Sequence, residues 1–324
     1  MLGDAVRLIE DATATRLVPG AVVGVIDAAG RSEVAIAGVA QWVPEARPLD
    51  AGMWFDLASL TKVIVTVTQA LRLVETGALA LADPLGRILP EASARVAAVT
   101  FEQALAHQAG FEPFVRFETW CNDPAELRDR VIRHDWPLAA KVYSDIGYVL
   151  VGLALERMTG ASLAETTLGE GLTFRPPRTR AVPTELDAWR GRLLVGEVHD
   201  ERAYALGGAA GHAGLFGTAA GVLGFAQRLL AGAELSKNSM AELCRPRSAE
   251  RALGWVRQHQ GWSGGALAGP FALGHTGFTG TGLWIDFARG RAWTLLTNRV
   301  HPDRTRTPSI DALRRAVGEA IAQA

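Results

Sequence analysis

The stretch "FALGHTGFTGTGLWIDFARGRAWTLLTNRV", residues 271–300, indicates the fold class of this 324-residue chain. It contains three short runs rich in β-branched and aromatic residues, and these runs are separated by Gly277, Gly280 and Gly290. Runs of this kind, bounded by glycine, are typical of β-strands joined by tight turns. The stretch "SIDALRRAVGEAIAQA", residues 309–324, then predicts a last helix.

The first 40 residues also predict a helix next to β-strands, here with the helix first. Residues 4–16 have helical spacing and end before Pro19-Gly20. The stretch "AVVGVIDAAGRSEVAIAGVA", residues 21–40, contains two β-rich runs joined by residues 28–31, which is a hairpin signal. Strands near both ends therefore predict that the termini meet in one antiparallel sheet with helices against it.

The middle of the chain differs from both ends. Residues from about 85 to 190 form helical segments separated by loops with proline and glycine. The fold class is therefore α/β (α+β), with one lobe built from residues 1–80 and 190–324 and a mostly helical lobe inserted at residues 81–189. We expect a cleft where the two lobes meet.

Composition limits the classes of partner. The chain has 33 basic and 34 acidic residues, so no global charge would hold it to nucleic acid or to an anionic membrane. A small molecule or a short peptide is the expected substrate. Cys121 and Cys244 match neither a zinc-site spacing nor a disulfide framework.

Targeting signals are missing from the chain as it stands. Residues 1–20 lack the basic start and apolar block of a signal peptide. No apolar run reaches the length of a membrane span before a charged residue interrupts it. These features predict a cytoplasmic protein without a membrane span.

The stretch "FDLASLTKVIVT", residues 55–66, holds Ser59 and Lys62 in an apolar run. On a helix, residues three apart share a face, so the two side chains can hydrogen-bond. Serine becomes a nucleophile when a base takes its proton, and burial can lower a lysine pKa enough for that task. The alternative is that Ser59 caps the helix and Lys62 is solvated in its first turn.

Two further segments accompany this pair. "VYSDIGYVLVGLALERMTG", residues 142–160, places Tyr143 and Asp145 before a helical run, and His275-Thr276-Gly277 lies in the β-rich stretch quoted above. The order Ser-x-x-Lys, Tyr-Ser-x, then a basic residue with Thr-Gly resembles the serine β-lactamase and penicillin-binding protein superfamily. The segments most similar to its class C β-lactamase-like group are "FDLASLTKV", "ALAHQAGF", "YSDIGY", "GGAAGHAGLFGTA" and "GHTGFTGTGLWID".

The resemblance implies a β-lactamase/transpeptidase-like fold and a role for each matching residue. Ser59 would attack a carbonyl group and become acylated, Lys62 would take its proton, and Tyr143 would share the acid–base work. The backbone N–H groups of Ser59 and Phe278 would form the oxyanion hole. Without the resemblance, Tyr143 reads as a half-buried aromatic residue whose hydroxyl is satisfied at a helix start.

Two positions depart from the family pattern. Asp145 stands where many relatives have asparagine, and its charge would raise the pKa of Lys62 unless a tight pair fixes the geometry. Alternatively, Asp145 caps the following helix. His275 replaces the usual lysine and would be charged only part of the time. The expected substrate contacts are Asp145, His275, Thr276 and Gly277. Gly277 has no side chain, so it would let the substrate approach the backbone closely.

Two more histidines lie in "GEVHDERAYALGGAAGHAGLFGTA", residues 196–219. We expect His199 and His212 to contact substrate or to fix the loop by hydrogen bonds. The wide gap between them and the lack of nearby cysteine argue against a zinc site. Neither a metal nor an organic cofactor is predicted.

The predicted function is that of a serine hydrolase with a Ser59 acyl-enzyme. The resemblance favours an amidase on muropeptide fragments that cleaves the bond between N-acetylmuramic acid and L-alanine. A carboxylesterase is the next alternative, followed by a weak β-lactamase or DD-peptidase. A non-catalytic sensor of cell-wall fragments is the alternative from another class. The sequence leaves the oligomeric state open.

Overall fold

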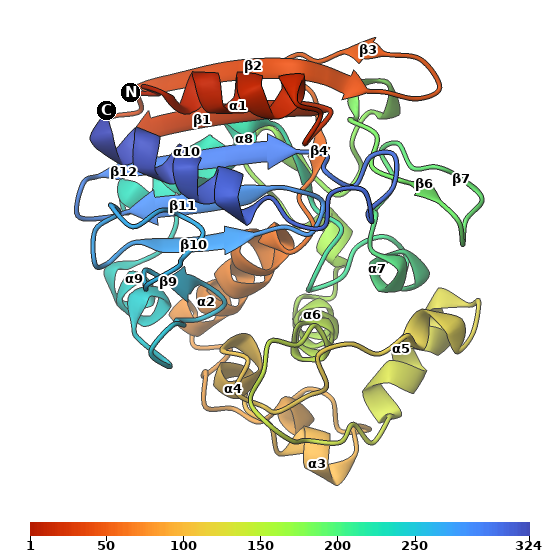
Figure 1. Cartoon of the computed structure of the whole chain (residues 1–324). Coiled ribbons are helices and arrows are strands. Elements are labelled where there is room, and N and C mark those ends of the chain that lie inside the picture. Colours follow the sequence, from red (N-terminus) through yellow and green to blue (C-terminus); the bar gives the residue numbers. More distant parts are fainter.

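A computed structural model describes all residues, 1–324. Its main feature is a seven-stranded antiparallel sheet with the order β3-β2-β1-β12-β11-β10-β9 (Figure 1). The strands are β1 Gly20–Asp27, β2 Ser32–Gln41, β3 Arg47–Pro48, β9 Val256–Arg257, β10 Leu273–Thr276, β11 Gly282–Asp286 and β12 Arg291–Thr297. The predicted fold class is confirmed.

The two ends of the chain join at the centre of this sheet. Strand β1 pairs with β12 from Ala21 opposite Thr297 to Asp27 opposite Arg291. The predicted hairpin joins β1 to β2, and Gly30 takes the left-handed conformation that its turn requires, with φ +85°. The strands from the two ends of the chain thus form one sheet, as the sequence patterns at both ends predicted.

Helices cover both faces of the sheet. The terminal helices α1 (Ala5–Ala14) and α10 (Asp311–Gln323) lie against one face, and α8 (Ala219–Leu230) packs against the other (Figure 1). On the α1–α10 side a separate apolar cluster contains Trp284 and Trp293, whose rings stack 6.0 Å apart. The larger core begins on the α8 side and continues into the rest of the molecule.

A group of helices lies below the sheet in Figure 1. It comprises α3 Ala94–Ala97, α4 Phe101–Leu105, α5 Pro124–Arg133 and α6 Ile146–Thr159. Helix α6 is buried along most of its length and packs against α4. One continuous core joins these helices to the sheet, and the lobe boundaries at residues 81 and 189 stay a prediction.

The helix after Ser59 begins at Leu60 and has an unusual first part. Residues Lys62–Val67 form a π-helix, η1, which continues as α2, Thr68–Glu75. As predicted, the helix stops before Gly77, whose φ is +72°. All six residues of η1 are buried, and π-helical turns occur mostly at functional sites.

Short elements complete the chain. A three-stranded sheet has the order β4-β8-β5, with β4 Phe55–Asp56, β5 Leu172–Thr173 and β8 Phe216–Gly217, and β6 Leu186–Asp187 pairs with β7 Arg192–Leu193. The remaining helices are α7 Glu201–Ala205, α9 Lys237–Cys244 and the 3₁₀ turns η2 Leu85–Arg87, η3 Phe117–Thr119, η4 Leu163–Glu165 and η5 Arg178–Arg180. None of the helices is long and apolar enough to span a bilayer.

Candidate active site

A tight turn between β4 and η1 presents Ser59. Ala58 takes a positive φ of 46°, a conformation that costs a non-glycine residue free energy and clusters at functional sites. The buried carboxylate of Asp56 holds this turn, because it accepts the backbone N–H of Ala58 at 2.8 Å. The chain then enters the helix at Leu60, so Ser59 lies immediately before the helix N-terminus.

Two side chains converge on the hydroxyl oxygen of Ser59. Lys62 Nζ donates to Ser59 Oγ at 2.9 Å, and Tyr143 Oη donates to the same atom at 3.1 Å. Lys62 is fully buried, so the alternative of a solvated lysine in the first turn is wrong. The hydroxyl of Tyr143 does not merely satisfy the start of α6 but points to Ser59, 84 residues away in sequence.

The charge state of Lys62 differs from the prediction that burial lowers its pKa. Burial does favour the neutral amine, but the carboxylate of Asp145 lies 2.7 Å from Nζ, and with Tyr143 it leaves the pKa of Lys62 raised. Lys62 is therefore an ammonium in the resting enzyme. The negative charge of Asp145 raises the pKa of Lys62, as expected, and with Tyr143 it outweighs the lowering by burial.

Asp145 belongs to a closed ring of polar groups, which we call the charge ring. Arg202 donates to Asp145 Oδ2 at 2.6 Å and to Asp200 Oδ2 at 3.0 Å. His212 Nε2 lies 2.8 Å from Asp200 Oδ1, and the carbonyl of His212 accepts a hydrogen bond from Lys62 Nζ at 3.2 Å. The side chain of Asp145 makes no capping bond, so the expectation that it caps α6 is wrong.

The charge ring stabilises its own ionised groups. Burial alone would raise the pKa of Asp145, but the charges of Lys62, His212 and Arg202 lower it well below its usual range. The pKa of Asp200 is likewise well below its usual range, because His212 and Arg202 outweigh burial. Buried charges persist only when they are compensated in this way.

Two free backbone donors flank Ser59. The N–H groups of Ser59 and Phe278 donate to no atom of the protein. The two segments are tied together, because Thr279 Oγ1 donates to the Asp56 carbonyl at 2.7 Å and Thr281 Oγ1 to the Leu57 carbonyl at 3.1 Å. Unpaired donors held beside a serine are the arrangement that an oxyanion hole requires.

Gly277 is needed for the close contact between the segment before Ser59 and the segment after β10, a role that the sequence did not indicate. A Cβ atom at Gly277 would lie 2.1 Å from Thr281 Oγ1 and 2.5 Å from the Leu57 carbonyl. The close approach that needs a glycine here is to the protein's own chain. Thr276, in contrast, lines the cavity, as expected for a substrate contact.

His275 is a neutral side chain, which corrects the expectation of a partial cation. It is buried, and its Nδ1 lies 2.9 Å from the Thr276 carbonyl. Burial, with the nearby charges of Lys62 and Arg251, lowers the pKa of His275 to about 3. It can therefore offer a substrate a hydrogen bond at neutral pH, but not a charge.

The two other histidines occupy different places. His199 lines the cavity and pairs with Glu185 at 2.9 Å, while its ring stacks on Phe278 at 5.7 Å. Arg304 pairs with the same Glu185 at 2.7 Å. His212 is buried behind Asp200 and does not line the cavity, so its geometry favours the loop-fixing alternative.

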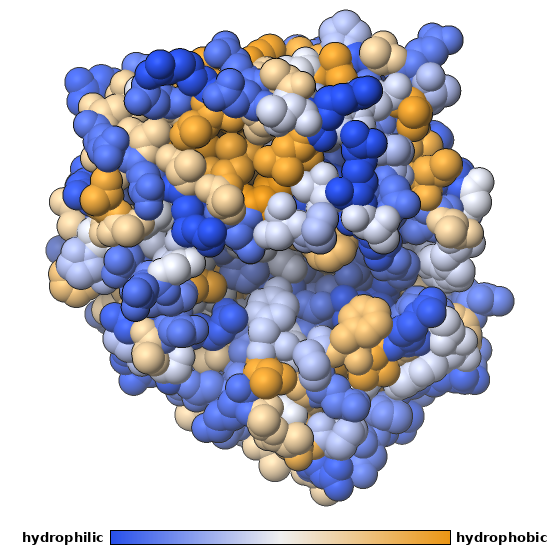
Figure 2. Space-filling view, in the orientation of Figure 1, coloured by the Kyte–Doolittle hydropathy of each residue, from blue (hydrophilic) through white to orange (hydrophobic).

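A cavity of about 460 Å³ opens above Ser59. Its walls combine the residues of the site with Phe114, Glu201, Arg251 and Arg304. Phe114 and Phe278 are 62% and 50% exposed and provide apolar surface in an otherwise charged cavity. Figure 2 shows the hollow between the sheet and the lower helices as mostly hydrophilic, with hydrophobic atoms beside it.

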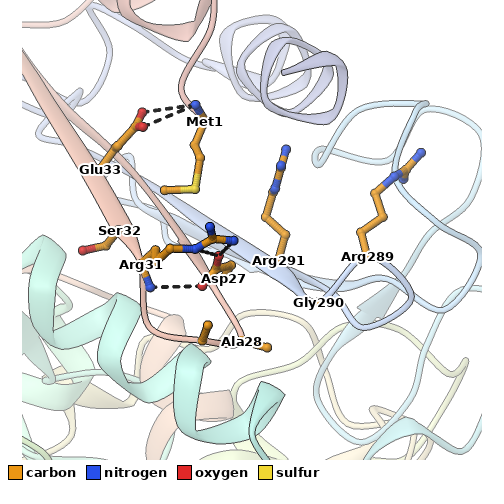
Figure 3. Close-up of a pocket in the computed structure, with 10 residues that line it drawn as sticks. Met1, Asp27, Ala28, Arg31, Ser32, Glu33, Arg289, Gly290 and Arg291 are labelled. Carbon is orange, nitrogen blue, oxygen red and sulfur yellow. Dashed lines mark hydrogen bonds and ion pairs between the residues drawn. The ribbon is translucent and has the colours of Figure 1, made fainter.

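A larger and more open cavity of about 650 Å³ lies at the β1–β2 turn (Figure 3). Its charges are paired with near neighbours: Arg31 with Asp27 at 2.7 Å and the amino group of Met1 with Glu33 at 3.2 Å. Arg291 donates to the Ile321 carbonyl at 2.7 Å. This cavity contains no histidine, cysteine or buried charge pair, so the cavity above Ser59 is the candidate active site.

The charge ring is also the one place where three groups could ligate a metal. Asp145, Asp200 and His212 offer ligand atoms within 4.8 Å of one another. Lys62 and Arg202 already neutralise both carboxylates at these positions. The residues therefore do not fit a cation, and no step of the chemistry is assigned to one.

Several residues of the site were missed by the sequence analysis. Arg202 and Arg304 reach the cavity from α7 and from the loop after β12, and Glu185 joins them from a third segment. The one available signal was the position of Arg202 three residues after His199. Arg251 was also missed, although it lies next to Tyr143, with its guanidinium 5.3 Å from the ring centroid.

Comparison with known proteins gives a consistent result. The family model described as Beta-lactamase matches residues 5–317. An N-acetylmuramyl-L-alanine amidase of Bacillus subtilis (strain 168) is 32% identical over 310 residues, which cover 79% of this chain and 69% of that protein. A putative D-alanyl-D-alanine carboxypeptidase of Salmonella agona (strain SL483) is 28% identical over 302 residues, 76% of this chain and 69% of that protein.

The fold has close counterparts among solved structures. The crystal structure of a class C β-lactamase from Rhodobacter sphaeroides superposes with a TM-score of 0.75, covering 98% of both chains, at 20% sequence identity. At that identity the likeness concerns the fold alone.

Proposed function

This chain belongs to the Beta-lactamase family, and we propose that within it the chain is an amidase that cleaves the bond between N-acetylmuramic acid and L-alanine. That it is a serine hydrolase follows from the family and from its named relatives. The amidase activity is proposed because the Bacillus subtilis relative that bears this name is 32% identical.

One observation carries the proposed chemistry: Ser59 Oγ accepts hydrogen bonds from both Lys62 and Tyr143, beside two unpaired backbone N–H groups. In the proposed reaction Ser59 Oγ attacks the lactyl carbonyl carbon, and the N–H groups of Ser59 and Phe278 stabilise the oxyanion. Tyr143 takes up the serine proton as its own phenolic proton passes to the departing nitrogen of alanine, and the ammonium of Lys62 stabilises the negative charge that develops on the phenol oxygen during this relay. Water then hydrolyses the ester on Ser59, which releases the acid and restores the serine.

The substrate side of the proposal draws on the cavity. A volume of about 460 Å³ with charged walls and two exposed phenylalanines suits a polar sugar derivative that also presents apolar faces. The side chain of His275 is neutral, so it adds no permanent charge to the wall where relatives have lysine.

The test is release of L-alanine from N-acetylmuramoyl-L-alanine by the wild type and by Ser59→Ala. We expect release by the wild type and its loss in the variant. The thermal midpoints of both proteins control for folding. A folded wild type that binds the substrate but releases no alanine and is not labelled by a fluorophosphonate would instead be a sensor of cell-wall fragments.

D-Alanyl-D-alanine carboxypeptidase activity is the second candidate, because the Salmonella agona relative is named for it. Both reactions release an amino acid with a free carboxylate. Release of D-alanine from a peptide ending in D-Ala-D-Ala, without release of L-alanine from the muramoyl substrate, would favour this candidate. Turnover of acyl esters alone would favour a carboxylesterase.

A further inference from the structure

Three arginines line the cavity above Ser59, and one of them has no acidic partner. Arg202 pairs with Asp145 and Asp200, and Arg304 pairs with Glu185 and Glu201. Arg251 forms no ion pair with a carboxylate, and its Nη1 atom is buried without a hydrogen-bond partner. A buried, unsatisfied guanidinium nitrogen costs free energy unless a ligand supplies the missing acceptor.

The position of Arg251 is fixed by its main chain. Its carbonyl accepts the N–H groups of Arg247 and Ser248, and its own N–H donates to Ser248 Oγ at 3.1 Å. It also bridges to Val256, the first residue of β9, at the edge of the main sheet. The backbone that carries Arg251 is thus anchored at the edge of the main sheet, and its side chain lines the cavity from there.

The other cations near Ser59 are already engaged. The ammonium of Lys62 is paired with Asp145 at 2.7 Å, and the side chain of His275 is neutral. An anionic group that enters this cavity therefore meets one cation without a partner, Arg251. Guanidinium groups bind carboxylates through two parallel hydrogen bonds and cannot lose their proton in a protein.

The location of Arg251 relative to Tyr143 suggests which part of the substrate it meets. Its guanidinium lies over the ring of Tyr143, and the hydroxyl of the same ring reaches Ser59 Oγ. A departing nitrogen that takes its proton from Tyr143 lies at that hydroxyl. In an amino acid, the α-carboxylate is two bonds from the nitrogen and can extend along the ring toward Arg251.

We propose that Arg251 binds the free α-carboxylate of the departing amino acid, so that the site selects amides and esters whose leaving group carries a carboxylate. This inference deepens the proposed function and rests on it for the identity of the amino acid. The proposed role of Arg251 does not depend on the acyl group of the substrate, because Arg251 is assigned to the leaving group alone.

Two matched substrate pairs test the proposal. The first pair is N-acetylmuramoyl-L-alanine and N-acetylmuramoyl-L-alaninamide, which differ only in the carboxylate. The second is 3-carboxyphenyl acetate and phenyl acetate, in which the acyl group is acetyl and only the leaving group changes. The measured quantity is the ratio of kcat/KM for the acid over its neutral counterpart.

We expect the wild type to prefer the acid by about 10- to 100-fold, the range of one charge-assisted hydrogen-bonded pair. Arg251→Met should bring the ratio close to one. Arg251→Lys should keep part of the preference, because lysine keeps the positive charge but lacks the two parallel N–H donors of a guanidinium group. Arg257→Met is the matched control: Arg257 lies on β9, its Nη1 donates to the Ala249 carbonyl, and it does not line the cavity. That variant should keep the wild-type ratio.

The outcomes separate the inference from the proposed function. Equal turnover of acid and neutral substrate by the wild type, or an unchanged ratio in a folded Arg251→Met, overturns the role of Arg251. Failure to cleave either muramoyl substrate, with an Arg251-dependent preference in the phenyl pair, removes the muramoyl amidase and leaves the carboxylate site standing.

Discussion

Two cavities of the molecule differ in how their charged groups are paired. At the β1–β2 turn, the more spacious cavity is bordered by pairs such as Arg31–Asp27, in which the arginine side chain is 79% exposed (Figure 3). Above Ser59, the smaller cavity lies over Lys62 and Asp145, which are buried and paired at 2.7 Å. Here Ser59 N–H, Phe278 N–H and Arg251 Nη1 still lack a partner.

In this molecule, hydrogen-bonding groups that lack a partner identify the site better than cavity volume does. An exposed ion pair contributes at most about 1 kcal/mol, and its formation requires little of the fold. Buried charges require compensation, and a fold that maintains several of them beside a nucleophile has a use for them.

Replacing Lys62 by methionine should lower kcat by about 10²- to 10³-fold, the usual effect of removing one preorganised donor that stabilises developing negative charge. The physical reason is that Ser59 Oγ and Asp145 both lose the ammonium that links them. The matched control is Lys237→Met at the exposed start of α9, which should keep wild-type kcat. Steady-state kinetics on p-nitrophenyl acetate would measure both, and equal kcat values in the two variants would contradict the account.

Replacing Arg202 by methionine should lower the free energy of unfolding by about 3–5 kcal/mol, because the buried carboxylate of Asp145 and the half-buried one of Asp200 lose a partner. The control is Arg192→Met, where the arginine side chain is 46% exposed and pairs with Glu197, and a much smaller loss is expected because solvent screens the pair. Urea denaturation gives both values. If the two losses were alike, the charge ring would not be the buried, compensated network described above.

Replacing His275 by asparagine should weaken the effect of acid on stability. The folded pKa of about 3 is lower than the unfolded value of about 6.5, so the unfolded state binds more protons between these pH values. The free energy of unfolding therefore falls as pH falls through this window. Urea denaturation at pH 7 and pH 5 should show a smaller loss in the variant than in the wild type, and an equal loss would indicate that His275 titrates normally in the fold.

Replacing Arg31 by alanine, at the larger cavity, should change almost nothing. The Arg31 side chain is 79% exposed, so its pair with Asp27, four residues away in the sequence, is screened by solvent and contributes little. Turnover of p-nitrophenyl acetate by this variant should match the wild type. A large loss of activity would break the contrast between the two cavities by giving the outer one a function.

Local patterns carried most of what the sequence predicted. The hairpin at residues 28–31, the strands after residue 271 and the contact of Ser59 with Lys62 all follow from spacings of a few residues. The family resemblance added Tyr143 and Phe278, which the structure brings close to Ser59 or to the turn that bears it.

Long-range pairing explains what the sequence did not predict. Arg202 meets Asp145 across 57 residues, and no periodicity relates the two positions. The pKa of Lys62 depends on whether burial or that aspartate dominates, which a motif alone does not determine. The sequence also predicted a partly charged His275, whereas burial in the cavity wall lowers its pKa and keeps the side chain neutral. The charges of a site are therefore a property of the assembled fold.

The proposed chemistry requires that Ser59 becomes acylated. Mass spectrometry tests this on protein that is quenched during turnover of p-nitrophenyl acetate and then digested. We expect a mass increase of one acetyl group on the peptide that contains Ser59, and no increase on that peptide in Ser59→Ala. Turnover without any acyl group on this peptide, or an acyl group on another residue that accounts for turnover, would contradict it.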